Sequence, residues 1–378
     1  MNTCIINGKI ILEDKIVESN LYIKDGLIKK IDSTVPDDGY DVIDAHHNYV
    51  SPGFIEMHSH GRGGCDTMDA TLESLQTICS ETVKTGVTSY LPTTMTMSIE
   101  DTAKAINNVY ENKDKINDCR ILGVHMEGPF FSKKYKGAQP EEYMIAPTIE
   151  HFKQLTNNHI DIISKVSLAP ELEGIEELIQ YLNEQEILVS AGHTSATYED
   201  VMKGVDLGVR SATHTYNAMT PLTHRAPGVV GATMDSDKIY AELILDGLHV
   251  TYAAARVLMK AKGYDKITLV SDSLEAAGLE PGQYSLAGQP VWVVDGACRL
   301  ESGTLAGSIT SMNKEVYNAV HYCNVPLVDA VKMASTNCAR ALKLNDVGII
   351  EVGKKADIVI FNEDIDIKNV LIEGKKVI

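Results

Sequence analysis

The sequence predicts an α/β protein in which a (β/α)8 TIM barrel is joined to a small β-sandwich domain formed from both termini. Three observations support this prediction: eight β-rich apolar runs alternating with helical patterns, hairpin signals near both ends, and a length of 378 residues. A chain of this length exceeds what one simple core usually fills. We predict the barrel at residues 51–346 and the small domain at residues 1–50 and 347–378.

The central part of the chain shows the βα alternation that is typical of a parallel sheet. Helical candidates between the strands include "TLESLQTICSETVKTG", "IEELIQYLNEQ" and "YEDVMKGVDLG". A doubly wound open sheet is the alternative, but no Gly-x-Gly-x-x-Gly follows the first strand candidate. The strand candidates are, in order, "GFIEMHSH", "GVTSYLPTT", "RILGVHMEG", "DIISKVSLAPE", "EILVSAGHT", "VRSATHT", "IYAELILDGLH" and "KITLVSDS".

Both terminal segments alternate apolar and polar residues over short pieces, which favours strands joined by tight turns. Asn7-Gly8 and Asp25-Gly26 are turn signals in the first segment, and Glu373-Gly374 is one in the last. Neither segment could bury much apolar surface alone. We therefore expect them to pair with each other.

Composition limits the partners and the compartment. The net charge of −18 disfavours nucleic acid and anionic membrane surfaces, so an anionic small substrate would need locally placed cations. No apolar run approaches the roughly 18 to 20 residues that span a bilayer, and the first residues lack a secretory pattern, so we expect a cytoplasmic protein. Seven cysteines without a Cys-x-x-Cys pair predict reduced thiols.

Residues suited to metal binding and acid–base chemistry stand at the ends of the strand candidates, where a barrel gathers its active site. A single histidine there is more often structural, Glu127 could be a rim carboxylate, and Asp272 could be a helix cap. Of the twelve histidines in the chain, five stand at strand ends, and separate structural roles explain so many less well. His125 could equally be a core residue or a neighbour of the site. The strand-end residues are His58, His60, Glu127, His193, His214, Asp246, His249 and Asp272.

This residue set predicts a metal-dependent barrel. Imidazoles and carboxylates without paired cysteines suit zinc or ferrous iron in a site with an open position. A bound zinc ion makes hydroxide available near neutral pH, and a carboxylate must then move the proton. Asp272, at the end of the last strand, is placed for that task.

Ordered sequence motifs resemble those of the N-acetylglucosamine-6-phosphate deacetylases, a branch of the amidohydrolase superfamily. The resemblance covers nearly the whole chain and implies hydrolysis of the 2-acetamido group of an amino-sugar phosphate, giving glucosamine 6-phosphate and acetate. It also implies one or two divalent ions, with zinc favoured, and a homodimer in which a neighbour's loop lies near the phosphate. The motifs are "PGFIEMHSHG", "HMEGPF", "AGHT", "ATHTYNAM", "HRAPG", "DGLHV", "SDS" and "TLAGS".

The resemblance also implies roles for individual residues. Glu127, His193 and His214 would hold the main metal, and the intact His58 and His60 pair allows a second. Asp272 would be the catalytic acid and base, with His249 stabilising the oxyanion. Substrate contacts are expected from Ala138, Gln139, Asn217, Ala218, Arg225, Asp246, Gly247, Leu248 and His249, with Leu305, Ala306 and Gly307 on the acetyl side.

Several points stay open on the sequence alone. Gln139 stands where other members of the family have histidine, so an amide could replace an imidazole there. The role of Cys65, close after His60, is unassigned. Alternative functions are deacetylation of N-acetylgalactosamine 6-phosphate, cyclic-amide hydrolysis on the same scaffold, and a silent binding protein. The last is disfavoured because all the candidate ligands and Asp272 are present.

Overall fold

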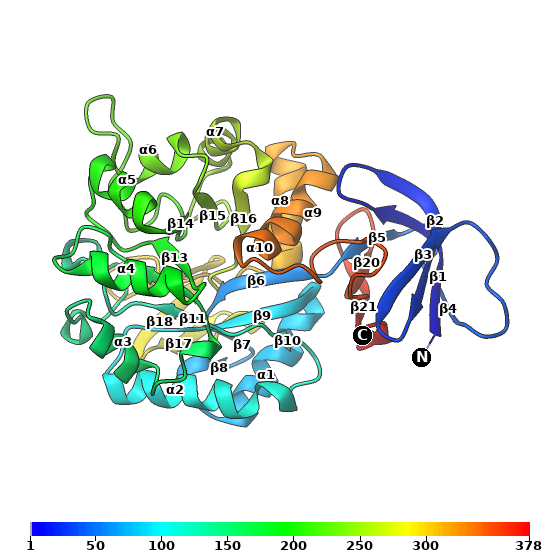
Figure 1. Cartoon of the computed structure of the whole chain (residues 1–378), viewed down its shortest axis with the longest axis horizontal. Helices are drawn as coiled ribbons and strands as arrows, with labels where there is room; N and C mark the ends of the chain where they lie inside the picture. The colour runs from blue at the N-terminus through cyan, green and yellow to red at the C-terminus, as the bar shows by residue number, and fades with distance from the viewer. Residues whose placement is uncertain (1) are drawn as a thin grey trace.

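A barrel of eight parallel strands forms the centre of the protein in the computed structural model, which describes residues 2–378 (Figure 1). Each predicted strand candidate contains one of these strands, so the TIM-barrel prediction is confirmed. The two-residue strand β10 (Arg120–Ile121) also pairs with β9. The barrel strands are β6 (Phe54–Ser59), β9 (Val87–Thr94), β11 (Val124–Glu127), β12 (Ile163–Leu168), β13 (Leu188–Ala191), β14 (Val209–Ala212), β15 (Tyr240–Leu243) and β16 (Ile267–Leu269).

The ring closes between its first and last strands through the segment that follows β16. Asp272 donates its backbone N–H to the carbonyl of His58 on β6 at 2.8 Å. The buried Glu56 carboxylate lies at the same junction and accepts from the backbone N–H of Ser271 at 3.2 Å. The closure therefore fixes Asp272 directly beside the end of β6.

Helices cover the outside of the barrel and bury apolar side chains against it (Figure 1). In α4 the buried stripe consists of Ile175, Leu178, Ile179 and Leu182, the spacing expected of one helix face. Five helices begin at a Ser or Thr whose side chain accepts from the third backbone N–H, namely α1, α2, α3, α5 and α7. The helices are α1 (Leu72–Thr82), α2 (Ile99–Asn112), α3 (Ile149–Leu155), α4 (Ile175–Glu184), α5 (Tyr198–Leu207), α6 (Gly228–Asp235), α7 (Tyr252–Lys262), α8 (Met312–Cys323), α9 (Leu327–Ala334) and α10 (Thr336–Ala341).

Strands from the two ends of the chain form one eight-stranded sheet beside the barrel, as the sequence predicts (Figure 1). The ends meet where β5 pairs antiparallel with β20, and β1 pairs with β4 and β5 along different parts of its length. The boundaries at 50/51 and 346/347 remain predictions. The strands are β1 (Asn2–Ile11), β2 (Ile16–Lys24), β3 (Leu27–Asp32), β4 (Asp41–Asp44), β5 (Tyr49–Pro52), β20 (Ile358–Phe361), β21 (Ile367–Ile372) and β22 (Lys375–Lys376).

A three-stranded antiparallel sheet that we did not predict lies between β16 and α8. It consists of β17 (Gly282–Leu286), β18 (Gln289–Val294) and β19 (Ala297–Leu300). The turns Ala287-Gly288 and Asp295-Gly296 separate its strands, and such turns are a recognisable hairpin signal. A second small ribbon pairs β7 (Gly61–Arg62) with β8 (Cys65–Asp66).

The seven cysteines are all free thiols, as expected, and six of them are buried. No helix within residues 2–378 has the length and apolar character needed to cross a membrane.

Candidate active site

Three imidazole nitrogens surround one carboxylate oxygen at the C-terminal ends of the strands. Glu127 Oε1 lies 3.3 Å from His58 Nε2, 3.4 Å from His193 Nε2 and 3.3 Å from His214 Nε2. These residues come from four strands or the loops directly after them. The barrel thus brings together ligands that lie up to 156 residues apart in the sequence, which is the separation of His58 and His214.

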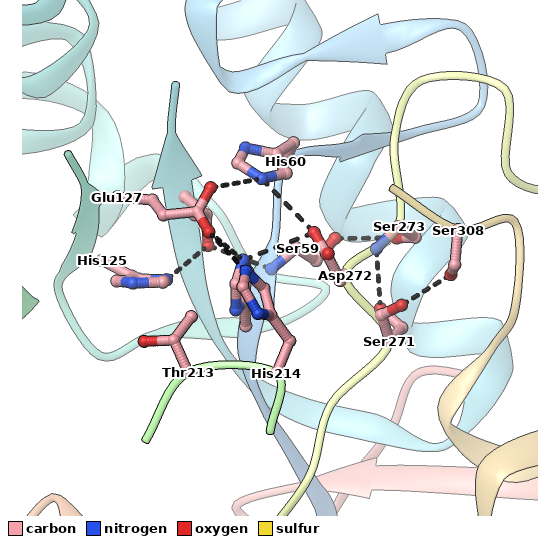
Figure 2. Close-up of polar contacts among 12 residues, drawn as sticks. Ser59, His60, His125, Glu127, Thr213, His214, Ser271, Asp272, Ser273 and Ser308 are labelled. Carbon is pink, nitrogen blue, oxygen red and sulfur yellow. Dashed lines mark hydrogen bonds and ion pairs between the residues drawn. The ribbon is translucent and has the colours of Figure 1, made fainter. Parts of the chain in front are cut away.

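A second group lies on the other side of Glu127. His60 Nε2 is 3.2 Å from Glu127 Oε2 and 3.4 Å from Asp272 Oδ1, and His58 Nε2 is 3.3 Å from the same Asp272 atom. Figure 2 shows His60 between the two carboxylates. His58, His60 and Asp272 form one compact set of possible ligands, and Glu127, His193 and His214 form another.

Three of these residues have an unusual backbone conformation. His193, His214 and Asp272 have φ angles of 45°, 31° and 48°, in the left-handed region that side chains other than glycine rarely adopt. His193 and His214 lie two residues after β13 and β14, and Asp272 lies three residues after β16, so the left-handed residue turns the chain just beyond the strand end. Such local strain is concentrated at functional sites.

The donor set fits a divalent metal ion. Ligand atoms at about 2.0–2.2 Å from a tetrahedral ion lie about 3.3–3.6 Å apart, close to the distances to Glu127 Oε1, and His193 Nε2 lies 3.1 Å from His214 Nε2. His58 Nε2 is fully buried without a hydrogen bond, although two carboxylates are nearby. Nitrogen and oxygen ligands of this kind accept zinc, iron and other divalent ions.

The outer ring nitrogens of two ligands have defined partners. His193 Nδ1 lies 3.1 Å from the carbonyl of Tyr135, which can only accept, so Nδ1 carries the hydrogen and Nε2 is free to bind a metal. His58 Nδ1 lies 3.3 Å from a carboxylate oxygen of Glu242. Neither Tyr135 nor Glu242 is among the residues predicted from the sequence.

The close packing of imidazoles and carboxylates shifts their pKa values. Burial alone would lower the pKa of His58, but the charges of Asp272 and Glu127 raise it to about 9. Burial alone would raise the pKa of Asp272, but His58 and His60 hold it at about 2. The pKa of Glu127 likewise lies well below its usual value, because neighbouring imidazoles outweigh burial. Asp272 is therefore a carboxylate at neutral pH.

The loop with the sequence "TLAGS" is fastened to Asp272. Ser308 donates its backbone N–H to the Asp272 carbonyl at 2.7 Å. Gly307 has a φ of 60°, and a Cβ there would lie 2.9 Å from Leu274 and 3.1 Å from the Asp272 carbonyl oxygen. Only glycine fits this close approach, which explains how two distant motifs form one wall of the site.

An open pocket of about 500 Å³ lies above the two ligand groups. Not every predicted substrate contact reaches it: Arg225 is exposed in its loop, and Ala306 is fully buried. Within the described residues 2–378, Arg225, Asp246, Gly247, Leu248 and Ala306 are not part of the lining. The predicted residues that do line it are His60, Glu127, Ala138, Gln139, His193, Asn217, Ala218, His214, His249, Asp272, Leu305 and Gly307.

Gln139 uses its amide group to hold Glu127. Its Oε1 accepts from the backbone N–H of Thr96 at 2.9 Å, and its Nε2 donates to Glu127 Oε2 at 2.7 Å. The side chain is nearly inaccessible, at 3 % exposure. A contact between Gln139 and the sugar remains a prediction, whereas its hydrogen bonds orient the carboxylate that both ligand groups share.

Two cations at the pocket were not identified from the sequence. Lys134 lies over the ring of Tyr135, with its Nζ 5.7 Å from the ring centre, and Arg299 donates to the carbonyl of Gly303. Neither has a carboxylate partner among the residues that the structure describes. Both line the pocket and are free to meet an anionic group.

His249 faces the pocket with a carboxylate behind it. Its Nδ1 lies 2.7 Å from Asp246 Oδ2, while Asp246 Oδ1 accepts the backbone N–H groups of Leu248 and His249. Burial lowers the pKa of His249, but the bond and charge of Asp246 outweigh burial and raise it. Asp246 therefore acts through His249, although it does not line the pocket.

We predict that Asp246→Asn lowers the pKa of His249. The asparagine oxygen can still accept the two backbone N–H groups, but the negative charge that favours the protonated imidazole is lost. If protonated His249 serves the reaction, the alkaline limb of kcat/KM against pH moves to lower pH. An alkaline limb at the wild-type position would contradict this role, and Asp246→Glu, which keeps the charge, is the matched control.

The remaining histidines and Cys65 do not contribute to the pocket. His125 is fully buried between Ser167 and Thr93, with its Nε2 2.8 Å from Ser167 Oγ, and is thus a core residue beneath the site. Cys65 is partly exposed on β8. The other six histidines are exposed or half-buried: His46, His47, His151, His159, His224 and His321.

Comparison with known proteins identifies the family. The amidohydrolase family model matches residues 49–377. This chain belongs to the amidohydrolase family. It is 38 % identical over 359 residues to N-acetylglucosamine-6-phosphate deacetylase of Lysinibacillus sphaericus, covering 95 % of this chain and 93 % of that relative. The deacetylase of Bacillus subtilis (strain 168) is 36 % identical over 366 residues, covering 95 % and 92 %.

Solved structures agree. The crystal structure of N-acetylglucosamine-6-phosphate deacetylase from Pasteurella multocida matches with a TM-score of 0.94 and 34 % identity, covering 100 % of this chain and 99 % of that one. These relatives place this amidohydrolase in the N-acetylglucosamine-6-phosphate deacetylase branch, which confirms the resemblance inferred from the motifs.

Proposed function

We propose that this amidohydrolase removes the acetyl group of N-acetyl-D-glucosamine 6-phosphate, giving D-glucosamine 6-phosphate and acetate. The observation that carries the proposal is the convergence of Glu127, His193 and His214 on one point beside Asp272, at the floor of an open pocket. A Mycobacterium smegmatis deacetylase structure in complex with that sugar phosphate has a TM-score of 0.93 and 26 % identity to this chain.

The chain's own residues support acid–base catalysis on an amide. A bound divalent ion would supply Lewis acidity and lower the pKa of a water molecule from about 15.7 to near 7. Asp272, ionised at neutral pH, accepts a proton from the attacking water and delivers one to the departing nitrogen. His249 donates a hydrogen bond toward the developing oxyanion. The new C–O bond replaces the C–N bond, and acetate and a free amine leave.

The phosphate requires cations in a protein of net charge −18. Lys134 and Arg299 line this chain's pocket without a carboxylate partner among residues 2–378, and phosphate would gain charge-assisted hydrogen bonds from them. Arg225, predicted from the resemblance, projects from an exposed loop. In the homodimer we propose, that loop could serve a neighbouring pocket. A cytoplasmic location and zinc as the physiological ion are further parts of the proposal.

Acetate release from a panel of acetylated sugars tests the function. We expect release from N-acetylglucosamine 6-phosphate, much less from the sugar without phosphate, loss on chelation and recovery with zinc. N-acetylgalactosamine 6-phosphate belongs in the panel, because a deacetylase for that epimer from Escherichia coli O157:H7 is 33 % identical over 360 residues. No acetate from any member with metal present would refute the proposal.

We also predict two metal ions per chain. Both ligand groups are complete, and Glu127 offers one oxygen to each, with Oε1 near His193 and His214 and Oε2 near His60. Protein prepared without chelators and saturated with zinc should hold two ions by elemental analysis. A stoichiometry fixed at one under metal excess would contradict the second site.

A further inference from the structure

A chain of three fully buried polar groups crosses the barrel interior below the ligands. His58 Nδ1 lies 3.3 Å from Glu242 Oε2, and Glu242 Oε1 lies 2.5 Å from Lys165 Nζ. His58, Glu242 and Lys165 each have 0 % exposure. They project inward from β6, β15 and β12, so the chain spans the barrel and is separate from the pocket residues.

The structure gives Lys165 one visible role, which is to compensate the charge of Glu242. Within residues 2–378 its Nζ makes no hydrogen bond, and its one ion pair is with Glu242. A lone buried carboxylate is strongly unfavourable, and an ammonium group at 2.5 Å compensates it. Ser211 adds a hydroxyl donor to the same carboxylate oxygen at 3.2 Å. Glu242 is thereby fixed with its second oxygen toward His58.

This arrangement sets which nitrogen of His58 can bind a metal. A carboxylate only accepts hydrogen bonds, so in neutral His58 the hydrogen is on Nδ1 and the Nε2 lone pair faces Glu127 and Asp272. His193 has a neutral carbonyl, that of Tyr135, in the corresponding place. A carboxylate behind an imidazole raises its basicity as a ligand and holds the ring in position.

We propose that Lys165 and Glu242 are positioning residues for the second metal: they hold His58 so that the group of His58, His60 and Asp272 can bind an ion. The inference rests on the two-metal capacity proposed above. The main group, Glu127, His193 and His214, has no hydrogen bond or ion pair with Lys165 or Glu242 and is linked to them only through His58, whose Nε2 lies 3.3 Å from Glu127 Oε1. Loss of the pair should therefore weaken one metal and spare the other.

Paired substitutions test this without leaving a buried charge unpaired. The apolar double variant, Lys165→Met with Glu242→Leu, replaces the ion pair by apolar side chains, an exchange that is often neutral for stability. The amide double variant, Lys165→Met with Glu242→Gln, keeps an oxygen that can accept from His58. Lys262→Met removes a half-buried lysine that donates to the Ser236 carbonyl and belongs to neither ligand group nor the pocket lining, and is the matched control.

Zinc titration with elemental analysis and calorimetry gives the affinity of each metal in the full chain. For the apolar double variant we expect the second metal to bind about 10- to 100-fold more weakly, with the first unchanged. The amide double variant should fall between this and wild type, and Lys262→Met should match wild type.

Three outcomes would overturn the inference. The first is an unchanged second-metal affinity in both double variants, and the second is an equal weakening of both metals, which indicates general destabilisation. If the apolar double variant does not fold, the amide double variant decides by the same criteria. The third is a wild type that binds one ion, which overturns the two-metal proposal as well. Acetate release by wild type judges the deacetylase proposal independently of these results.

Discussion

Asp272→Asn is expected to reduce kcat by about 10³- to 10⁴-fold, the upper part of the range for general acid–base catalysis. The residue serves twice, first accepting a proton from water and then protonating the amine, and asparagine can do neither. Its backbone bonds to His58 and Ser308 do not involve the side chain, so the wall of the pocket should persist. Steady-state acetate release measures the effect.

The control for this substitution is Asp265→Asn. Asp265 is an exposed carboxylate whose Oδ1 pairs with Lys332 at 2.8 Å, and it has no contact with the ligand groups. Its loss should leave turnover unchanged. For Asp272→Asn, zinc at the Glu127 group should remain bound and KM should change little. Turnover within tenfold of wild type would show that another group moves the proton.

The site residues could be predicted best where a reactive residue type stands at the end of a predicted strand. His58, His60 and Glu127 could be predicted because period-two alternation places them on the inner face, and a parallel barrel brings all strand ends together. His193, His214 and Asp272 followed from the same rule. Their left-handed backbone could not be predicted, since it depends on how each loop leaves its strand.

The residues that hold these ligands in position were harder to predict. Tyr135 acts through its carbonyl, which carries no side-chain signal. Lys165 and Glu242 lie within the apolar runs "ISKVSL" and "YAEL", where a charged residue is a signal of a buried pair, but their pairing depends on the closure of the barrel. Charged residues inside inward-facing strand positions therefore merit attention in other barrels.

The residues that line the pocket wall were hard to predict for a different reason. Arg225 was expected at the substrate from the family resemblance. Its guanidinium suits a phosphate, but neither the resemblance nor the residue type says where its loop ends. Arg299 reaches the pocket because the sheet of β17, β18 and β19 lies between β16 and α8. Turn pairs at 287–288 and 295–296 signal this sheet, but its packing against the site is a tertiary property.

Glu127→Gln should abolish turnover by removing the carboxylate that both ligand groups share. Glutamine keeps the size of the side chain, and its amide oxygen can still accept from Gln139, so the local structure should hold. The main group is left with two imidazoles and a neutral amide. We expect its zinc affinity to fall by more than the roughly 100-fold that loss of an outer partner can cause.

Glu315→Gln is the matched control, because Glu315 is another fully buried carboxylate in the same barrel. Burial raises the pKa of Glu315 well above its usual value, which favours the neutral form that an amide resembles. This variant should keep wild-type zinc binding and turnover. If Glu127→Gln instead retained zinc within tenfold of wild-type affinity, Glu127 would not be a ligand. His193 and His214 would then need another partner, and the proposed catalytic centre would have to be reassigned.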